Sequence, residues 1–182
     1  MREMALHILD VARNSIEAGA TDLQLTVIED GSTDRLEFEL RDNGPGLGPD
    51  ALGRVTDAFY TTRTTRRVGL GLALLQATCD RCEGNLLVAS EQGHGTTVHG
   101  VLRLGHVDRP PLGDMGGAIQ ALVCEAARTH LRYRHVVDGH AFELDTRALQ
   151  GELGEVPLSH PTVLDWVGDH VNAALREVGS RA

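Results

Sequence analysis

The start of the chain carries two kinds of hydrophobic spacing in succession. Between Glu3 and Ala18, apolar residues recur every three or four positions, which predicts an amphipathic helix with one buried stripe. In residues 23–28 and 36–40, apolar residues occupy every second position, which predicts two strands joined by a turn at 30–32. The pattern therefore predicts a helix followed by an antiparallel pair of strands.

The same two spacings continue through the rest of the chain. They predict a short helix at 50–55, a helix that opens at Gly69 and Gly71, strands at 85–90 and 96–104, a helix at 117–129, a hairpin at 131–137 and 141–144, and a closing helix at 162–178. We expect residues 1–105 to form one domain and 106–112, with two prolines, to form a linker. Residues 113–182 would be a small α+β subdomain whose limited apolar area requires packing on the first domain or on a partner.

Composition and charge narrow the class of protein. A chain of 182 residues with 41% apolar residues suffices for a compact core. Its longest apolar runs fall well short of the roughly 20 residues that span a membrane, and no signal peptide is visible, so we expect a cytoplasmic protein. The net charge of −9 argues against nucleic acid as a partner. An odd count of three cysteines suits a reducing compartment.

A polar stripe runs beside the apolar one on the first predicted helix. It includes His7, Asp10 and Asn14, which recur at helical spacing. Such a stripe is either a solvated face or one wall of a site. A lone helical histidine is more often structural, so we treat His7 as such.

Asp42 ends the second predicted strand and leads directly into Gly44 and Gly46. A carboxylate in this place can accept a hydrogen bond from an exocyclic amine, while glycines allow a planar base to approach closely. Adenine has such an amine. Another glycine-rich turn, with Gly93 and Gly95, precedes Thr96. Thr96 could place its hydroxyl against the base, although the turn alone indicates only a hairpin.

A loop rich in hydroxyl and guanidinium groups separates these features from the glycine-led helix. Its arginines offer forked donors for phosphate, and backbone amides at a helix start favour anions. The alternative is an exposed basic loop beside a packed leucine helix. The residues concerned are Thr62, Arg63, Arg66, Gly69, Leu70, Gly71 and Leu72.

The order and spacing of these segments over residues 1–105 resemble the GHKL superfamily, which shares the Bergerat ATP-binding fold. The resemblance is closest to the ATP-binding domains of histidine kinases. It implies a two-layer α/β sandwich with a mixed, mainly antiparallel sheet covered by helices on one face. It also implies that Asn14 ligates Mg²⁺, that Asp42 binds adenine, and that the loop and glycine residues named above, together with Thr96, complete the ATP site.

One position departs from the family pattern. Where hydrolysing members usually carry glutamate and histidine kinases more often asparagine, this chain has Asp10, a shorter candidate base. Because the first predicted helix begins almost at residue 1, we expect no phosphoacceptor hairpin before it. We therefore expect an ATP- and Mg²⁺-dependent kinase that acts on a protein partner. The alternatives are a slow ATPase or a nucleotide-gated switch or binding module, and a homodimer stays open.

The remaining candidate ligands have simpler interpretations. Cys79 and Cys82 form a C-x-x-C without a second ligand pair, so helix packing is favoured over metal or redox chemistry. Five histidines towards the C-terminus match no ligand spacing and are interpreted as scattered surface residues: His106, His130, His135, His140 and His160.

Overall fold

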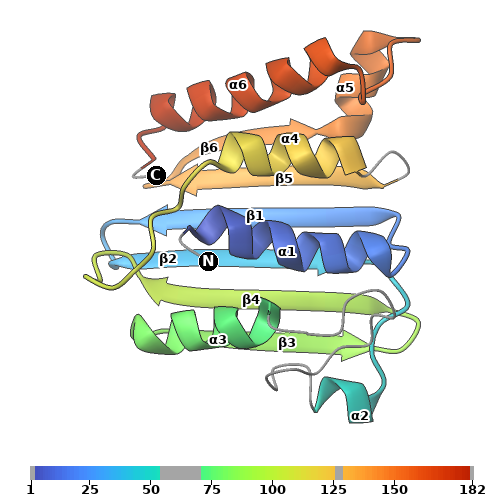
Figure 1. Ribbon diagram of the computed structural model, residues 1–182. Coiled ribbons are helices and arrows are strands. Elements are labelled where there is room, and N and C mark those ends of the chain that lie inside the picture. The colour runs from blue at the N-terminus through green and yellow to red at the C-terminus, as the bar shows by residue number, and fades with distance from the viewer. Residues whose placement is uncertain (1–2, 54–70, 126–128, 181–182) are drawn as a thin grey trace.

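The protein is built on one six-stranded sheet with its main helices over one face, as Figure 1 shows for the computed structural model. The structure describes residues 3–53, 71–125 and 129–180. Within them, the strands are β1 (Asp22–Asp30), β2 (Arg35–Asp42), β3 (Asn85–Glu91), β4 (Gly95–Arg103), β5 (His130–Val137) and β6 (His140–Asp145). The helices are α1 (Met4–Glu17), α2 (Pro49–Leu52), α3 (Gly71–Arg81), α4 (Met115–Glu125), α5 (Thr146–Leu153) and α6 (Pro161–Glu177).

The strands lie in the order β3-β4-β2-β1-β5-β6. All neighbours are antiparallel except β1 and β5, which run parallel, with Leu25 opposite Tyr133. The α+β class and the mixed, mainly antiparallel sheet are confirmed. The parallel pair matters because it joins the C-terminal strands to the strand beside β2.

One side of the sheet is buried and mostly apolar. Burial alternates strictly along β1, and Leu23, Leu25 and Val27 face inward. Figure 1 shows α1, α3, α4 and α6 over the same face of the sheet. One apolar core runs beneath these helices, from Leu86 of β3 to Leu175 of α6. Burial of this face is the main favourable contribution to folding.

The connection from β4 to α4 holds the start of α1. The amides of Met4 and Ala5 donate to the carbonyls of Pro111 (2.9 Å) and Leu112 (2.8 Å). These amides belong to the first turn of the helix and have no partner within it. The expected linker at 106–112 therefore contacts the first helix directly. Whether residues 113–182 fold separately stays a prediction, although their strands continue the same sheet.

Two of the five C-terminal histidines are buried, so the expectation of surface positions was wrong for them. His135 is fully buried, with Nε2 at 2.9 Å from Glu29 Oε1, and the Tyr133 hydroxyl lies 2.6 Å from its Nδ1. His130 lies between Asp22 Oδ2 (3.0 Å) and Asp145 Oδ1 (2.8 Å). Carboxylate partners from other strands compensate the burial of both rings.

Candidate functional site

Asp42 lies at the end of β2, where α1 and β4 meet it. Its Oδ1 accepts from the amides of Gly44 (2.8 Å) and Thr96 (3.3 Å), and its Oδ2 accepts from the Ser15 hydroxyl (2.6 Å). A carboxylate offers about four acceptor positions. These three donors are the ones that the described residues supply, and with respect to them one acceptor position on Oδ2 remains for a further donor.

Two glycines near Asp42 occupy positions that no side chain could fill. Gly95 has φ +92, and an added Cβ would overlap the carbonyl oxygen of Asp42. Gly46 has φ +64, and its Cβ would overlap the carbonyl oxygen of Glu91. Gly44 is less constrained, because its Cβ would lie 3.0 Å from Asp42 Oδ1. The turn after β2 is therefore packed tightly against the β3–β4 hairpin.

Hydroxyl groups hold the same turn in place. Ser90 Oγ lies 2.8 Å from Thr96 Oγ1 and accepts from the amide of Leu47 at 2.8 Å. Thr96 thus supplies its amide to Asp42 and its hydroxyl to Ser90. Sequence reasoning missed Ser15 and Ser90. Ser15 directly follows Asn14, but nothing local in the sequence shows that it reaches across to β2.

The polar stripe of α1 faces the start of α3. Asp10 and Asn14 are both half-buried. Gly71, the first residue of α3, lies so close to Asp10 that an added Cβ would overlap the carboxylate oxygen Oδ2. Asp10 has no hydrogen-bond partner among the described residues. The structure therefore brings Asp10 and Gly71 together, as the predicted site requires.

His7 lies one turn before Asp10 and is buried, with no hydrogen-bond partner for either ring nitrogen among the described residues. Burial lowers the pKa of His7 to about 4. The ring is therefore neutral at pH 7, and its burial fits the structural interpretation. Cys79 and Cys82 are also buried, and burial raises the pKa of Cys79 to about 12, so its thiol stays protonated.

Part of the predicted site lies outside the described residues. This applies to Thr62, Arg63, Arg66, Gly69 and Leu70. Leu72, in the first turn of α3, is half-buried and packs on the core. Among the residues that the structure does describe, no cluster of three or more His, Cys, Asp or Glu side chains could hold a metal ion.

Asn43 connects this end of the sheet to the C-terminal strands. Its Oδ1 accepts from the amides of Thr21 (2.9 Å) and Asp22 (2.8 Å). Asp22 in turn contacts His130. The arrangement as a whole presents a carboxylate with one acceptor position left, glycine turns and a helix start around one end of the sheet. The carboxylate can accept a hydrogen bond from an amine, and the backbone amides at the helix start can bind an anion.

Comparison with known proteins identifies the class. Residues 2–106 match the family described as Histidine kinase-, DNA gyrase B-, and HSP90-like ATPase, and the chain belongs to this family. The resemblance to the GHKL superfamily is thereby confirmed. The match covers α1, β1–β4, α2 and α3, together with every predicted site residue.

Curated sensor proteins and kinases are similar to part of the chain. The C4-dicarboxylate transport sensor protein DctB of Pseudomonas aeruginosa is 35% identical over 104 residues, which is 57% of this chain and 16% of that protein. Sporulation kinase E of Bacillus subtilis is 33% identical over 92 residues, which is 50% of this chain and 12% of that protein. The chain thus matches less than a fifth of the length of either relative.

A solved structure shares the fold over a longer stretch. The crystal structure of the N-terminal domain of a DNA repair protein superposes with a TM-score of 0.58 at 16% identity, and covers 80% of this chain and 53% of that one. This likeness supports the fold alone. In the described part of the chain, no helix has the length and apolar character needed to cross a membrane.

Proposed function

We propose that the chain binds Mg²⁺-ATP between α1, the end of β2 and the start of α3, and transfers the γ-phosphoryl group to a protein partner. The observation that carries the proposal is the geometry of Asp42. Three donors fix its carboxylate and, among the residues that the structure describes, leave one acceptor position on Oδ2. The exocyclic amine of adenine suits that position, whereas the carbonyl of guanine does not.

The other roles follow from position and chemistry. Gly44 and Gly46 shape the turn beside the base, and Thr96 holds Asp42 through its amide. The α1 amide side chain, Asn14, would supply one oxygen ligand to Mg²⁺, a hard cation that would neutralise phosphate charge. A hard cation held in this way needs no cluster of protein carboxylates. Thr62, Arg63, Arg66, Gly69 and Leu70 are proposed to cover the phosphates.

Phosphoryl transfer needs positioning and charge neutralisation more than a strong base. The first turn of α3 presents backbone amides that favour the negative charge of phosphate. Two of the sequence relatives are described as a sensor protein and a kinase, which supports transfer to a protein. The proposal includes a protein as the phosphoryl acceptor and a cytoplasmic location. It also allows the chain to form a homodimer.

A second candidate is a slow ATPase or nucleotide-gated switch. The observation in its favour is Asp10, whose carboxylate lies against Gly71 and is not occupied by a hydrogen bond from any described residue. Such a carboxylate is available to accept a proton from water. Its reach is one methylene shorter than that of glutamate, which favours slow turnover.

Calorimetric titration with a non-hydrolysable ATP analogue, with and without Mg²⁺, tests the site. We expect Mg²⁺-dependent binding. Incubation with γ-labelled ATP and candidate partners then separates the functions, because label on a protein indicates a kinase and label in free phosphate an ATPase. A folded protein that does not bind the analogue would contradict both.

Asp42→Asn should weaken binding of the analogue about tenfold or more, since a hydrogen bond to a charged group contributes about 1.5–3 kcal/mol. Asparagine keeps the shape of the side chain and one acceptor oxygen, so the fold should persist. Asp80→Asn is the matched control, because Asp80 is exposed on α3 and accepts a hydrogen bond from Gln76 of the same helix. Wild-type affinity in a folded Asp42→Asn variant would remove Asp42 from the base pocket.

A further inference from the structure

An ion pair joins the helix that carries the candidate site to the C-terminal segment. Arg13 of α1 donates from Nε to Glu125 Oε2 (2.8 Å) and from Nη2 to Glu125 Oε1 (2.5 Å). Glu125 is the last residue of α4. The two side chains are 36% and 41% exposed, but the forked geometry makes this pair stronger than an ordinary surface contact.

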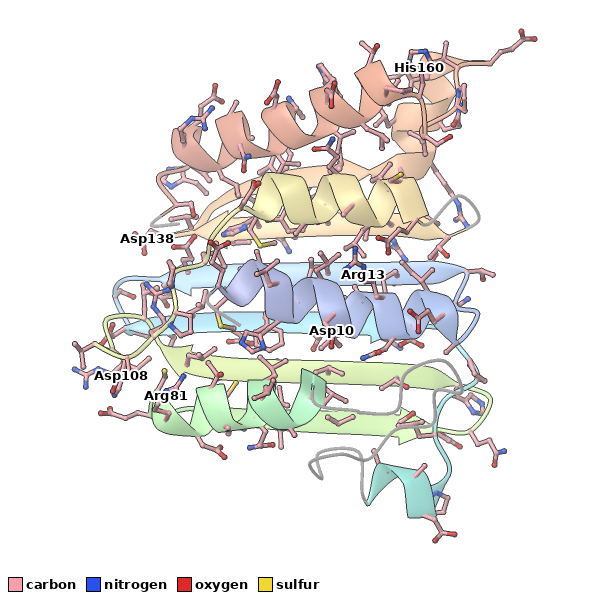
Figure 2. The ribbon with its side chains drawn as sticks, in the orientation of Figure 1. Asp10, Arg13, Arg81, Asp108, Asp138 and His160 are labelled. Carbon is pink, nitrogen blue, oxygen red and sulfur yellow. The ribbon has the colours of Figure 1, made fainter. Side chains whose placement is uncertain are left out.

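Arg13 has a second carboxylate one helical turn away. Residues three apart on a helix are neighbours, so the Arg13 guanidinium can reach Asp10. The pKa of Arg13 is raised, first by its hydrogen bond to Glu125 and also by the nearby charges of Asp10 and Glu17. Figure 2 shows Arg13 on the side of α1 that faces α4 and Asp10 on the side towards α3. In the structure the Arg13 guanidinium forms its ion pair with Glu125 rather than with Asp10.

This choice leaves Asp10 with its carboxylate against Gly71 and no hydrogen bond from a described residue. A carboxylate paired with arginine would give up acceptor positions and be a weaker base towards water. The identity of the partner of Arg13 therefore decides whether Asp10 is available at the start of α3.

We propose that Glu125 is a positioning residue for Asp10: by holding Arg13 on the α4 side, it keeps the Asp10 carboxylate free at the nucleotide site. The inference rests on the proposed function, in which Asp10 faces the phosphates. It gives the C-terminal segment a part in the chemistry of the ATP-binding segment. Glu125 acts through Arg13 and touches no substrate.

The first test needs no nucleotide. In ¹⁵N-labelled protein, the Nε–H resonance of Arg13 is assigned by its loss in Arg13→Ala. We expect Glu125→Ala to move this resonance, and Asp10→Asn added to Glu125→Ala to move it again. Asp10→Asn alone should move it much less than Asp10→Asn does in the Glu125→Ala background. If Asp10→Asn has no effect in the Glu125→Ala background, Arg13 has turned to Glu17 or to water, and the proposal is overturned.

The second test uses turnover of γ-labelled ATP by the full chain. Glu125→Ala should lower turnover about two- to threefold, the effect of a helical ion pair of about 0.5 kcal/mol. Arg13→Ala should leave turnover unchanged, and Arg13→Ala combined with Glu125→Ala should restore it. A purely structural tie between α1 and α4 predicts the opposite, namely equal losses in both single variants and no restoration in the double one.

Glu83→Ala provides the matched control, because it removes another exposed acid that pairs with an arginine, Arg103. It should leave turnover unchanged. A wild-type chain that neither binds nor turns over ATP would overturn the proposed function. The Arg13 resonance would still decide whether Glu125 keeps Arg13 from Asp10, so the two failures are distinguishable.

Discussion

His7 places an uncharged imidazole in the core beneath the candidate site. Burial lowers its pKa to about 4, against 6.5 for an exposed ring. As the pH falls, His7 of the unfolded chain therefore binds a proton near pH 6.5, whereas His7 of the folded chain binds it only near pH 4. Folding stability should fall as the pH drops through this window, by about 3 kcal/mol in all. Urea unfolding at a series of pH values between 4 and 7 measures this loss.

His7→Leu should flatten the pH dependence in that window, because the variant has no imidazole to protonate. His94→Leu is the matched control, since His94 is exposed in the β3–β4 turn. It should leave the slope unchanged. Asp30 does not obscure the result. Hydrogen bonds from Ser32 and Thr33 lower its pKa to about 2, so its protonation changes folding stability below pH 4, outside the measured range. An unchanged slope in His7→Leu would mean that His7 is protonated in the fold.

Individual residues differ in how far the sequence reveals them. The place of Asp42 at the end of a strand, followed by a glycine turn, could be predicted because it is a local pattern, while its role in binding stays a prediction. Ser15 could not, since its partner lies across the structure on β2. The burial of His135 was equally hidden, because it depends on Glu29 of another strand.

At the scale of elements, the β3–β4 hairpin packs against the end of β2 and holds Asp42 in place. Gly93 and Gly95 both have positive φ, but only Gly95 approaches another strand, at the carbonyl of Asp42. Gly93→Ala should cost about 1 kcal/mol of folding stability for the left-handed conformation alone. Gly95→Ala should cost clearly more, because β4 must also move away from the end of β2. Thermal and urea unfolding of the two variants compares these costs.

Nucleotide binding adds a second measurement on the same pair. Gly95→Ala should weaken binding of the ATP analogue, since the Thr96 amide that donates to Asp42 follows directly. Gly93→Ala should not, because nothing lies within 4 Å of its added Cβ. Equal stability and equal binding in the two variants would show that the close approach at Gly95 is not needed.

Hydrophobic spacing predicted most elements to within a few residues, because each buries one face. The helix expected at 162–178, for example, is α6 at Pro161–Glu177. Sequence reasoning missed α5, an eight-residue helix whose start was marked by Asp145, which caps it through the amides of Arg147 and Ala148. The parallel pairing of β1 with β5 was also missed, because spacing along one strand does not identify a distant partner.

At the scale of the whole molecule, the trailing segment is part of the same packing unit as the ATP-binding segment. Leu112 and Met115 are buried in the shared core, and Pro111 and Leu112 hold the first amides of α1. The resemblance to the family covers only residues 2–106, yet β5 covers the free edge of β1 beside it. An uncovered, apolar-faced edge strand is prone to aggregation.

Truncation after Leu112 should therefore leave residues 1–112 insoluble or without cooperative unfolding. The cut removes β5 from the edge of β1, and it uncovers the side of α1 that packs on α4. Gel filtration and circular dichroism of the truncated chain test this expectation. The isolated segment 113–182 is the companion measurement and should be unfolded, because its apolar face has no partner.

A soluble 1–112 that unfolds cooperatively and binds the ATP analogue as the full chain does would contradict this expectation. It would support the expected linker at 106–112 as a boundary between domains. It would also bear on Glu125, which the cut removes. Suppose that such a fragment bound the analogue but turned ATP over more slowly, and that Arg13→Ala restored its rate. The role of the C-terminal segment in packing would then be distinguished from its role in holding Arg13 away from Asp10. The fragment would then fold without residues 113–182 and still need them to keep Asp10 available.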